Sequence, residues 1–322
     1  MKLHTHIQLL LVSLQKLPKV LYPILGALLV LGSLPTSGAN AQTSPAGAAD
    51  LVSPPAPASA GAKQAPQKPP SGGAAPELIA RVTEMVSRMD QAASSKDIQA
   101  LLGYYGQDFR SDGLKPVDTR QAITGLWAKL QEPVYRTEVE SITEQKGQVV
   151  VTGTTRLQAV YSPGVALPTM GVVRLSSVVG SVSRFDKTSL KLVAQEIRSE
   201  RTTITAGTKS PVVNLTIPAS VRPGQDFKVE AVLEGPLDEG NPALGGISLI
   251  PLNMRTAAVP DSPSLEPLRA GGIFKTAKAP GQSEDQVVTL AFIRTSGLVL
   301  ISQRLKVTTA KPPTTMQSGV AQ

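Results

Sequence analysis

The hydrophobic pattern of this chain changes period once, near residue 133, and this change limits the folds open to it. Before that point, apolar residues recur at the three- and four-residue spacing of amphipathic helices. After it, runs rich in Val, Ile and Thr are separated by turn residues, as in antiparallel strands. The chain is therefore expected to place a helical segment before a long series of strands.

Three helices are predicted in the first part of this pattern. Each carries one apolar stripe and has a plausible start, such as Pro76 for the first and the Ser94 and Asp97 pair for the second. Glu132-Pro133 ends the third, because the residue before a proline disfavours helix. The stripes fall in the ranges 78–89, 98–105 and 123–130.

Four strands are predicted next, with turns at Gln145-Lys146-Gly147 and Asp186-Lys187-Thr188. They cover 134–143, 149–161, 170–185 and 190–205. Helices that collect on one face of an antiparallel sheet form an α+β fold. The predicted first domain, 76–207, therefore has three N-terminal helices packed on a curved antiparallel four-stranded sheet.

A second β block is predicted over residues 211–309. Short alternating strands are spaced evenly along it, and a clear hairpin closes it at Thr295-Ser296-Gly297. No helical pattern interrupts these strands. The expected fold of this block is a small all-β sandwich that follows the first domain.

The segments outside these two blocks predict export. Residues 1–41 combine basic residues, an apolar core and the small-x-small site Ala39-Asn40-Ala41, which is the pattern of a cleaved signal peptide. Residues 42–75 are rich in Pro, Ala and Gly and are expected to be a disordered linker, and 310–322 a disordered tail. A periplasmic or extracellular location follows. The alternative is an uncleaved N-terminal membrane anchor, since Pro18 to Leu34 approaches the length of a span.

The composition excludes several classes of chemistry. The chain has no cysteine, and its two histidines, His4 and His6, fall in the predicted signal peptide. The mature protein would lack the imidazole and thiol groups that most catalytic bases, nucleophiles and metal sites use. No cofactor motif and no metal-ligand cluster is present, so no cofactor and no metal are expected. The net charge of +8 is spread out, without basic runs interleaved with aromatic residues, and nucleic-acid binding is not expected.

Three segments of the first block resemble the nuclear transport factor 2-like superfamily, a cone-shaped α+β fold that includes SnoaL-like proteins. Residues 97–109 (DIQALLGYYGQDF) are similar to its second helix and the acidic loop after it. Residues 123–127 (ITGLW) are similar to its third helix, and 190–197 (LKLVAQEI) to its last strand. The 211–309 block resembles an immunoglobulin-like module. The two together resemble exported bacterial proteins of uncharacterised function.

The resemblance implies a pocket between a curved sheet and its helices. The candidates to line it are Tyr105, Trp127, Tyr161 and Asp108. Asp108 is the one candidate catalytic group, because a buried Asp near a tyrosine hydroxyl serves as a base in isomerase-type members. Each of the four also has an ordinary explanation: core packing for the aromatic residues, and a solvent-facing position at a helix exit for Asp108.

Charged residues within the predicted strands leave two further interpretations open. Glu138 and Glu140 share one face of a strand, which fits either acid–base work or a solvent-facing position. Arginines occur in the later strand runs, and any that pointed into the cone would form an anion site. These arginines are Arg156, Arg174, Arg184 and Arg198.

Two functions from different classes are predicted. The favoured one is an exported, non-enzymatic protein whose cone holds a small apolar ligand or docks a partner in the cell envelope. The alternative is an isomerase or dehydratase that uses Asp and Tyr groups in the cone. A structural envelope protein is a third interpretation. The superfamily resemblance also suggests homodimerisation through the sheet, and membrane contact is expected only if the signal remains uncleaved.

Overall fold

The computed structural model describes residues 73–111, 116–162, 171–235, 243–252, 263–268 and 271–309. The predicted signal peptide, the linker up to residue 72 and the tail from residue 310 lie outside the described residues. Within the described ranges, no helix combines the length and the apolar character needed to cross a bilayer.

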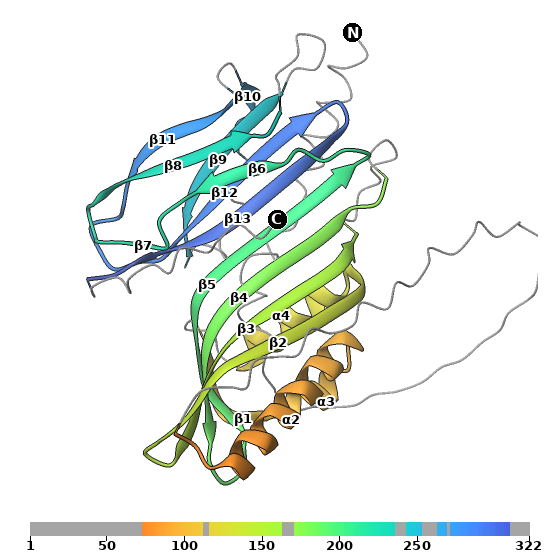
Figure 1. Ribbon diagram of the computed structural model, residues 1–322, viewed down its shortest axis with the longest axis vertical. Coiled ribbons are helices and arrows are strands. Elements are labelled where there is room, and N and C mark those ends of the chain that lie inside the picture. The colour runs from red at the N-terminus through yellow and green to blue at the C-terminus, as the bar shows by residue number, and fades with distance from the viewer. Residues whose placement is uncertain are drawn as a thin grey trace, which may run out of the picture.

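Three helices precede most of the strands (Figure 1). They are α2 (Pro76–Ser94), α3 (Ile98–Leu102) and α4 (Pro116–Trp127), with the short strand β1 (Tyr105–Ser111) between α3 and α4. The long strands that follow are β2 (Leu130–Gln145), β3 (Gln148–Tyr161), β4 (Arg174–Asp186) and β5 (Leu192–Gly207). The later strands are β6 (Val213–Thr216), β7 (Ser220–Val221), β8 (Asp226–Leu233), β9 (Leu244–Pro251), β10 (Glu266–Pro267), β11 (Gly272–Lys278), β12 (Gln286–Arg294) and β13 (Gly297–Val307).

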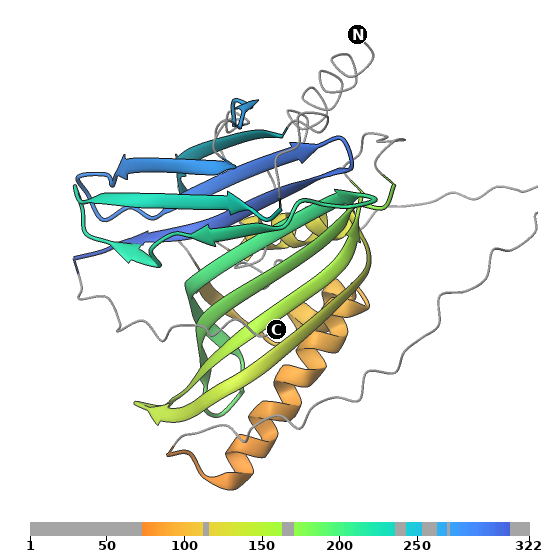
Figure 2. The same cartoon turned by 45° about the horizontal axis from the view of Figure 1, so that its top comes forward.

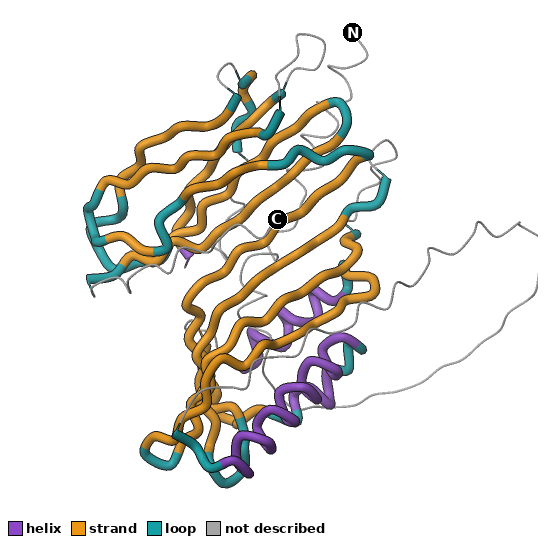
Figure 3. Tube along the Cα trace, in the orientation of Figure 1, coloured by secondary structure: helices purple, strands orange, loops and turns teal. Residues whose placement is uncertain are grey.

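The predicted fold class was wrong, because the four strands do not form a sheet of their own. The strands β10-β9-β12-β13-β5-β4-β3-β2 follow one another in a single ten-stranded sheet, which β1 and β7 complete at β5 and β13. Strands dominate the described chain, and the helices occupy one end of it (Figure 3). The protein is mostly β rather than a helix-and-sheet domain followed by a separate sandwich.

Strand β5 makes this continuity possible. Its second half pairs antiparallel with β13, from Gly207 opposite Gly297 to Arg201 opposite Gln303. Its first half uses the same edge for β1, which pairs with it in parallel at Leu192 and Ala194. A strand of 16 residues is long enough to offer one edge to two partners in turn. The sequence shows the length of β5 but not the strand that pairs with its free edge.

The two halves of this sheet bury opposite faces. Alternate residues of a strand point to opposite sides, so parity along β13 shows which side each core occupies. Leu298 and Leu300 join the core under the helices, whereas Val299 and Ile301 join the second core. The second core lies between β9-β12-β13 and a three-stranded sheet in the order β11-β8-β6. Figure 2 shows the helices and this smaller sheet covering different parts of the large one.

Helix α2 covers the free edge of the sheet as well as its inner face. Its buried positions, Val82, Met85 and Val86 among them, form the stripe expected from the sequence. At the edge strand β2, the backbone N–H of Tyr135 donates to Ser94 Oγ at 2.9 Å. The N–H of Thr137 donates to Asp90 Oδ2 at 2.5 Å. One helix side thus satisfies strand groups that would otherwise invite pairing with another chain.

The second predicted helix is shorter than expected. Asp97 caps it by accepting a hydrogen bond from the Ala100 N–H at 2.9 Å, and the helix ends at Leu102. Tyr105, which the sequence placed on the helical stripe, begins strand β1 instead. The spacing of Tyr105 and Phe109 fits both helix and strand, since residues four apart share a face in either. Pairing with β5 decides for the strand.

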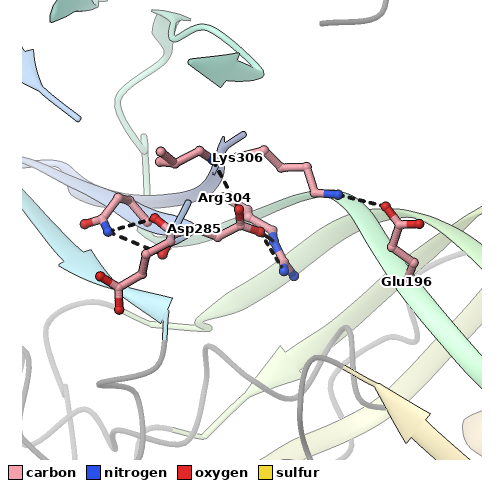
Figure 4. A network of polar contacts seen from close by, with 7 residues as sticks. Glu196, Asp285, Arg304 and Lys306 are labelled. Carbon is pink, nitrogen blue, oxygen red and sulfur yellow. Dashed lines mark hydrogen bonds and ion pairs between the residues drawn. The ribbon is translucent and has the colours of Figure 1, made fainter. Parts of the chain in front are cut away.

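A charged network joins the two blocks near the end of β13 (Figure 4). Asp285 Oδ2 accepts from Arg304 Nε at 2.9 Å and from Arg304 Nη2 at 2.8 Å. The Val307 N–H donates to Asp285 Oδ1 at 3.2 Å. On the same strand, Lys306 Nζ reaches Glu196 Oε1 of β5 at 3.0 Å. The network holds β13 to the start of β12 on one side and to β5 on the other.

Candidate functional site

A small cavity lies between α2 and the inner face of β2 to β5. Its volume is about 70 Å³. One wall is apolar, formed by Val86, Met89, Leu101, Tyr135, Val151, Val179, Phe185 and Leu192. Six polar side chains also line it: Asp90, Thr137, Thr155, Ser181, Ser183 and Gln195. Gly153 lines it as well, and its missing side chain leaves space between the strands.

Asp90 of α2 begins a chain of hydrogen bonds that runs through β2 to β3. Thr137 Oγ1 donates to Asp90 Oδ1 at 2.8 Å, in addition to the bond from the Thr137 N–H. Thr137 Oγ1 also lies 2.9 Å from Thr155 Oγ1 on β3, directly opposite in the register. These hydrogen bonds fix the orientation of the Asp90 carboxyl group at the cavity wall.

Burial raises the pKa of Asp90 above its usual value of 3.8, and the two bonds from Thr137 lower it in part. Removing water penalises the charged carboxylate, whereas donors stabilise it, so the net direction shows that desolvation is the larger effect. An Asp with a raised pKa holds its proton at a higher pH than an exposed Asp. Asp90 is therefore the group in this cavity that is best suited to proton exchange.

Gln195 supplies a second polar group on the far side of the cavity. Its Nε2 donates to Ser183 Oγ at 3.1 Å and lies 3.5 Å from Ser181 Oγ. Its Oε1 is buried and has no hydrogen-bond partner among the described residues. A buried carbonyl without a donor costs free energy, and a water or a small donor molecule in the cavity would satisfy it.

The four residues predicted from the sequence lie elsewhere. Asp108 is on β1 and faces solvent. Tyr105 is buried on the same strand, where its ring meets Phe109 edge-on at 5.2 Å between centroids, and burial raises the pKa of its phenol well above the usual value. Trp127 and Tyr161 are also buried in the core under the helices. None of the four is among the residues that line the 70 Å³ cavity.

Trp127 nevertheless contacts a residue of the cavity wall, Tyr135. Its Nε1 donates to the hydroxyl oxygen of Tyr135 at 3.1 Å. Burial raises the pKa of Tyr135, and the hydrogen bond from Trp127 lowers it in part. Trp127 thus orients a cavity tyrosine that the sequence did not single out.

Asp90 and Gln195 were missed because each looked like part of a regular element. Asp90 follows Val86 by four residues, so the helical period places it on the buried stripe of α2. An acidic residue on an apolar stripe is the signal that could have found it. Gln195 alternates with Ile197 on β5, but no pattern in the sequence marks its carbonyl as unpartnered.

Metal binding gains no support from the site. The described residues hold no group of three or more carboxylate or imidazole side chains that could bind an ion.

The strand arginines all lie on the outer face, away from the helices. Val179, Leu175 and Phe185 of β4 belong to the core under the helices, so the even-numbered residues of that strand point outward. Arg174 and Arg184 are even-numbered residues of β4, and Arg156 of β3 lies opposite Val178 in the register. Arg198 lies at a bulge of β5 and approaches Glu196 at 3.7 Å. No anion site inside the cone arises from these residues.

Glu138 and Glu140 are exposed on the same outer side. Glu140 Oε1 accepts a hydrogen bond from Thr154 Oγ1 at 2.7 Å. Their solvent-facing interpretation therefore fits the structure, and the pair takes no part in the cavity.

A wider hollow of about 440 Å³ opens on this outer face. Its lining combines apolar side chains, uncharged polar side chains and two charged ones. These are Val134, Ala159, Val160 and Leu175, then Gln158, Ser176, Thr203 and Thr205, and finally Arg174 and Glu132. The hollow is thus larger than the inner cavity and open to solvent. The outer face offers more room to a partner than the cone does.

One family matches the second block. Residues 208–308 match the family described as Domain of unknown function (DUF8623). The matched segment includes β6 to β13 and leaves β5 outside, although β5 pairs with β13. No curated protein matched the sequence.

The chain is similar to several solved structures. Bd1075 from Bdellovibrio bacteriovorus shares 14% identity at a TM-score of 0.28, over 37% of this chain and 39% of that one. This chain thus matches well under half the length of Bd1075. A conserved protein from Planctomyces limnophilus DSM 3776 shares 15% identity at a TM-score of 0.29, over 36% of this chain and 90% of that one. A protein from Shewanella denitrificans OS-217, named as SnoaL-like, shares 16% identity at a TM-score of 0.28, over 38% and 90% of the two chains.

Proposed function

We propose that this protein is an exported, non-enzymatic interaction protein that docks a partner in the cell envelope through the open face of its large sheet. Residues 76–207 would form a nuclear transport factor 2-like module, and 211–309 an immunoglobulin-like module that braces it. The signal-peptide pattern of residues 1–41 supports the export and the envelope location in this proposal.

The small volume of the inner cavity is the reason for proposing partner docking rather than ligand binding. A cavity of about 70 Å³ is well below the 300–1,000 Å³ of typical ligand pockets and holds roughly two water molecules. The helices and the sheet fill the rest of the cone with their own side chains, such as Leu126, Ile142 and Leu157, which are fully buried. The one cavity found between α2 and the sheet among the described residues is therefore too small for a small apolar ligand.

The continuity of the sheet supports the same proposal. Strand β5 belongs to both blocks, and β13 hydrogen-bonds to it over seven residue pairs. An interaction surface gains affinity when it is held rigid before binding, because less conformational freedom is lost on association. The shared strand gives the outer face that rigidity.

Two measurements test this proposal on the full chain. Native mass spectrometry of protein purified from its own envelope should find no retained small molecule. Hydrogen exchange with and without that envelope fraction should show protection on the outer strands β3, β4 and β5 rather than around α2. A retained molecule that is lost in the Ser183→Val/Gln195→Leu double variant, which fills the cavity, would contradict docking and establish ligand binding instead.

Asp90 keeps an enzymatic alternative open. Its raised pKa and its position beside Tyr135 at the cavity wall place an acid and a phenol in one small space. An isomerase or dehydratase of a very small substrate would use Asp90, rather than the exposed Asp108, as its base. Such a function requires turnover that Asp90→Asn abolishes and Asp108→Asn leaves unchanged.

A further inference from the structure

Three arginines of the outer face line up in one row across the sheet. Arg136 of β2 is directly opposite Arg156 of β3. Arg156 is opposite Val178 of β4, which in turn is opposite Arg201 of β5. Because neighbouring strands lie about 5 Å apart, the row spans roughly 15 Å. All three arginines are exposed.

These arginines share the outer face with Glu138, which lies two residues from Arg136 along β2, but they pair with no acidic side chain among the described residues. Other arginines find one: Arg88 pairs with Glu84 at 2.6 Å and Arg304 with Asp285 at 2.8 Å. The side chains of Arg136, Arg156 and Arg201 themselves form no ion pair and no hydrogen bond with another described residue. Like charges placed directly opposite on a sheet repel each other. An anion bound along the row would reduce this repulsion.

The row borders the outer hollow. Val134, Gln158 and Thr203 line the hollow, and each lies two residues along its strand from an arginine of the row. Arg174 lies within the lining itself. A molecule in the hollow would meet hydroxyl, amide and apolar groups, the carboxylate of Glu132, and guanidinium groups along one side. Neighbouring side chains already desolvate Arg201 and lower its pKa, which makes an anion contact there stronger than one in open water.

We propose that this face binds an anionic polysaccharide, with its acidic groups on Arg136, Arg156, Arg201 and Arg174 and its hydroxyl groups in the hollow. The proposal rests on the docking function and names the class of partner. Guanidinium groups bind carboxylate and phosphate groups through two parallel hydrogen bonds. Sugar hydroxyls match the Gln, Ser and Thr groups of the hollow.

Two other occupants fit the face less well. A flat anionic membrane would touch the arginine row but leave the hollow unfilled. A second copy of the chain, stacked face to face, would bring two arginine rows together and be repelled. A chain-like polyanion engages both the row and the hollow.

The test measures binding of the full chain to labelled galacturonate oligosaccharides by fluorescence anisotropy at two salt concentrations. Neutral dextran oligosaccharides serve for comparison. The wild type should bind galacturonate and not dextran, more weakly at high salt. The Arg136→Gln/Arg156→Gln/Arg201→Gln variant should bind at least about a hundredfold more weakly, because charged hydrogen bonds each contribute roughly a factor of ten. Equal melting temperatures would show that the variant is folded.

A charge-matched variant gives the control. Arg81→Gln/Arg222→Gln/Lys275→Gln removes the same charge from exposed positions elsewhere and should lose no more than about threefold. Thr203→Val, which alters the hollow without changing charge, should also weaken binding. An equal loss in the charge-matched variant would overturn the proposal.

Vesicles of phosphatidylglycerol separate the polymer from a lipid surface. Binding to these vesicles without binding to galacturonate would overturn the proposal in favour of a membrane contact, and so would failure to bind either probe. The docking function would still be judged independently, by the hydrogen-exchange protection that the envelope fraction produces on the outer strands.

Discussion

The two halves of the large sheet build their cores differently. Under the helices, polar groups line a small unfilled space between helix and sheet, among them Asp90, Thr137 and Gln195. Under the three-stranded sheet, the core cluster is apolar, and the charged pair Asp285–Arg304 lies where β12 begins. The partly buried polar groups lower the stability of the first half, whereas the second half gains stability from close apolar packing.

The largest expected effect compares one phenylalanine from each core. Phe109 and Phe292 are both fully buried. Phe109→Ala and Phe292→Ala should each lower the free energy of unfolding by about 4 kcal/mol, from lost burial and the cavity left behind. Because β5 and β13 join the cores, each variant should still unfold in one transition by chemical denaturation. Two separate transitions would show that the shared sheet does not couple the halves.

Asp285→Ala should come next, at about 3 kcal/mol, because it removes the carboxylate that compensates the charge of the buried Arg304 guanidinium. The control is Glu84→Ala, which breaks the exposed pair with Arg88 and should cost less than about 1 kcal/mol. Thermal unfolding measures both. Equal losses would mean that the buried pair is no more important than the exposed one.

Gly207→Ala tests the junction itself and should cost about 2 kcal/mol. Gly207 has a φ of +106°, and a Cβ added there would lie 2.3 Å from the Cα of Gly297. Amide exchange should rise at β13 and at the second half of β5. Gly147→Ala is a useful comparison, because Gly147 also has a positive φ but no atom within 4 Å of an added Cβ.

Asp90→Asn should have the smallest effect, and one that depends on pH. The folded state raises the pKa of Asp90, so its stabilising contribution is complete below pH 3.8 and is lost as pH rises through the folded value. The stability of the wild type relative to the variant should therefore fall as pH rises.

Glu196 should show the opposite pH dependence, because its pKa is lowered, chiefly by the hydrogen bond from Lys306. Glu196→Gln should therefore reduce stability above pH 4.5 and reduce it less below that pH. Urea unfolding across this range measures both slopes.

Much of the local structure could be predicted from the sequence. The apolar stripe starting at Pro76, the turn at Gln145-Lys146-Gly147 and the hairpin at Thr295-Ser296-Gly297 match α2, the β2–β3 turn and the β12–β13 hairpin. These features depend on residues close together in the chain, where periodicity and turn preference act directly. Strand β1 was the exception, since its short alternation fitted a helix equally well until its pairing with β5 was known.

The candidate site was less predictable. Asp108 and Tyr105 were chosen because they resemble residues of a known family, whereas the cavity is lined by Asp90 and Gln195. The outer arginines were visible in the sequence, but their common face required the strand register. A shift of one residue in that register would have turned the same side chains into the core.

The sequence by itself determined where helices give way to strands, which residues form the buried stripes, and that the chain has no cysteine. Only the tertiary structure decided that β5 and β13 join two blocks into one sheet, that its two halves bury opposite faces, and that Arg136, Arg156 and Arg201 form one row. The physical reason is that hydrophobic period and turn chemistry act between near neighbours in the chain. The choice of strand partner is made by backbone groups that are alike in every residue, so it depends on how the whole chain packs.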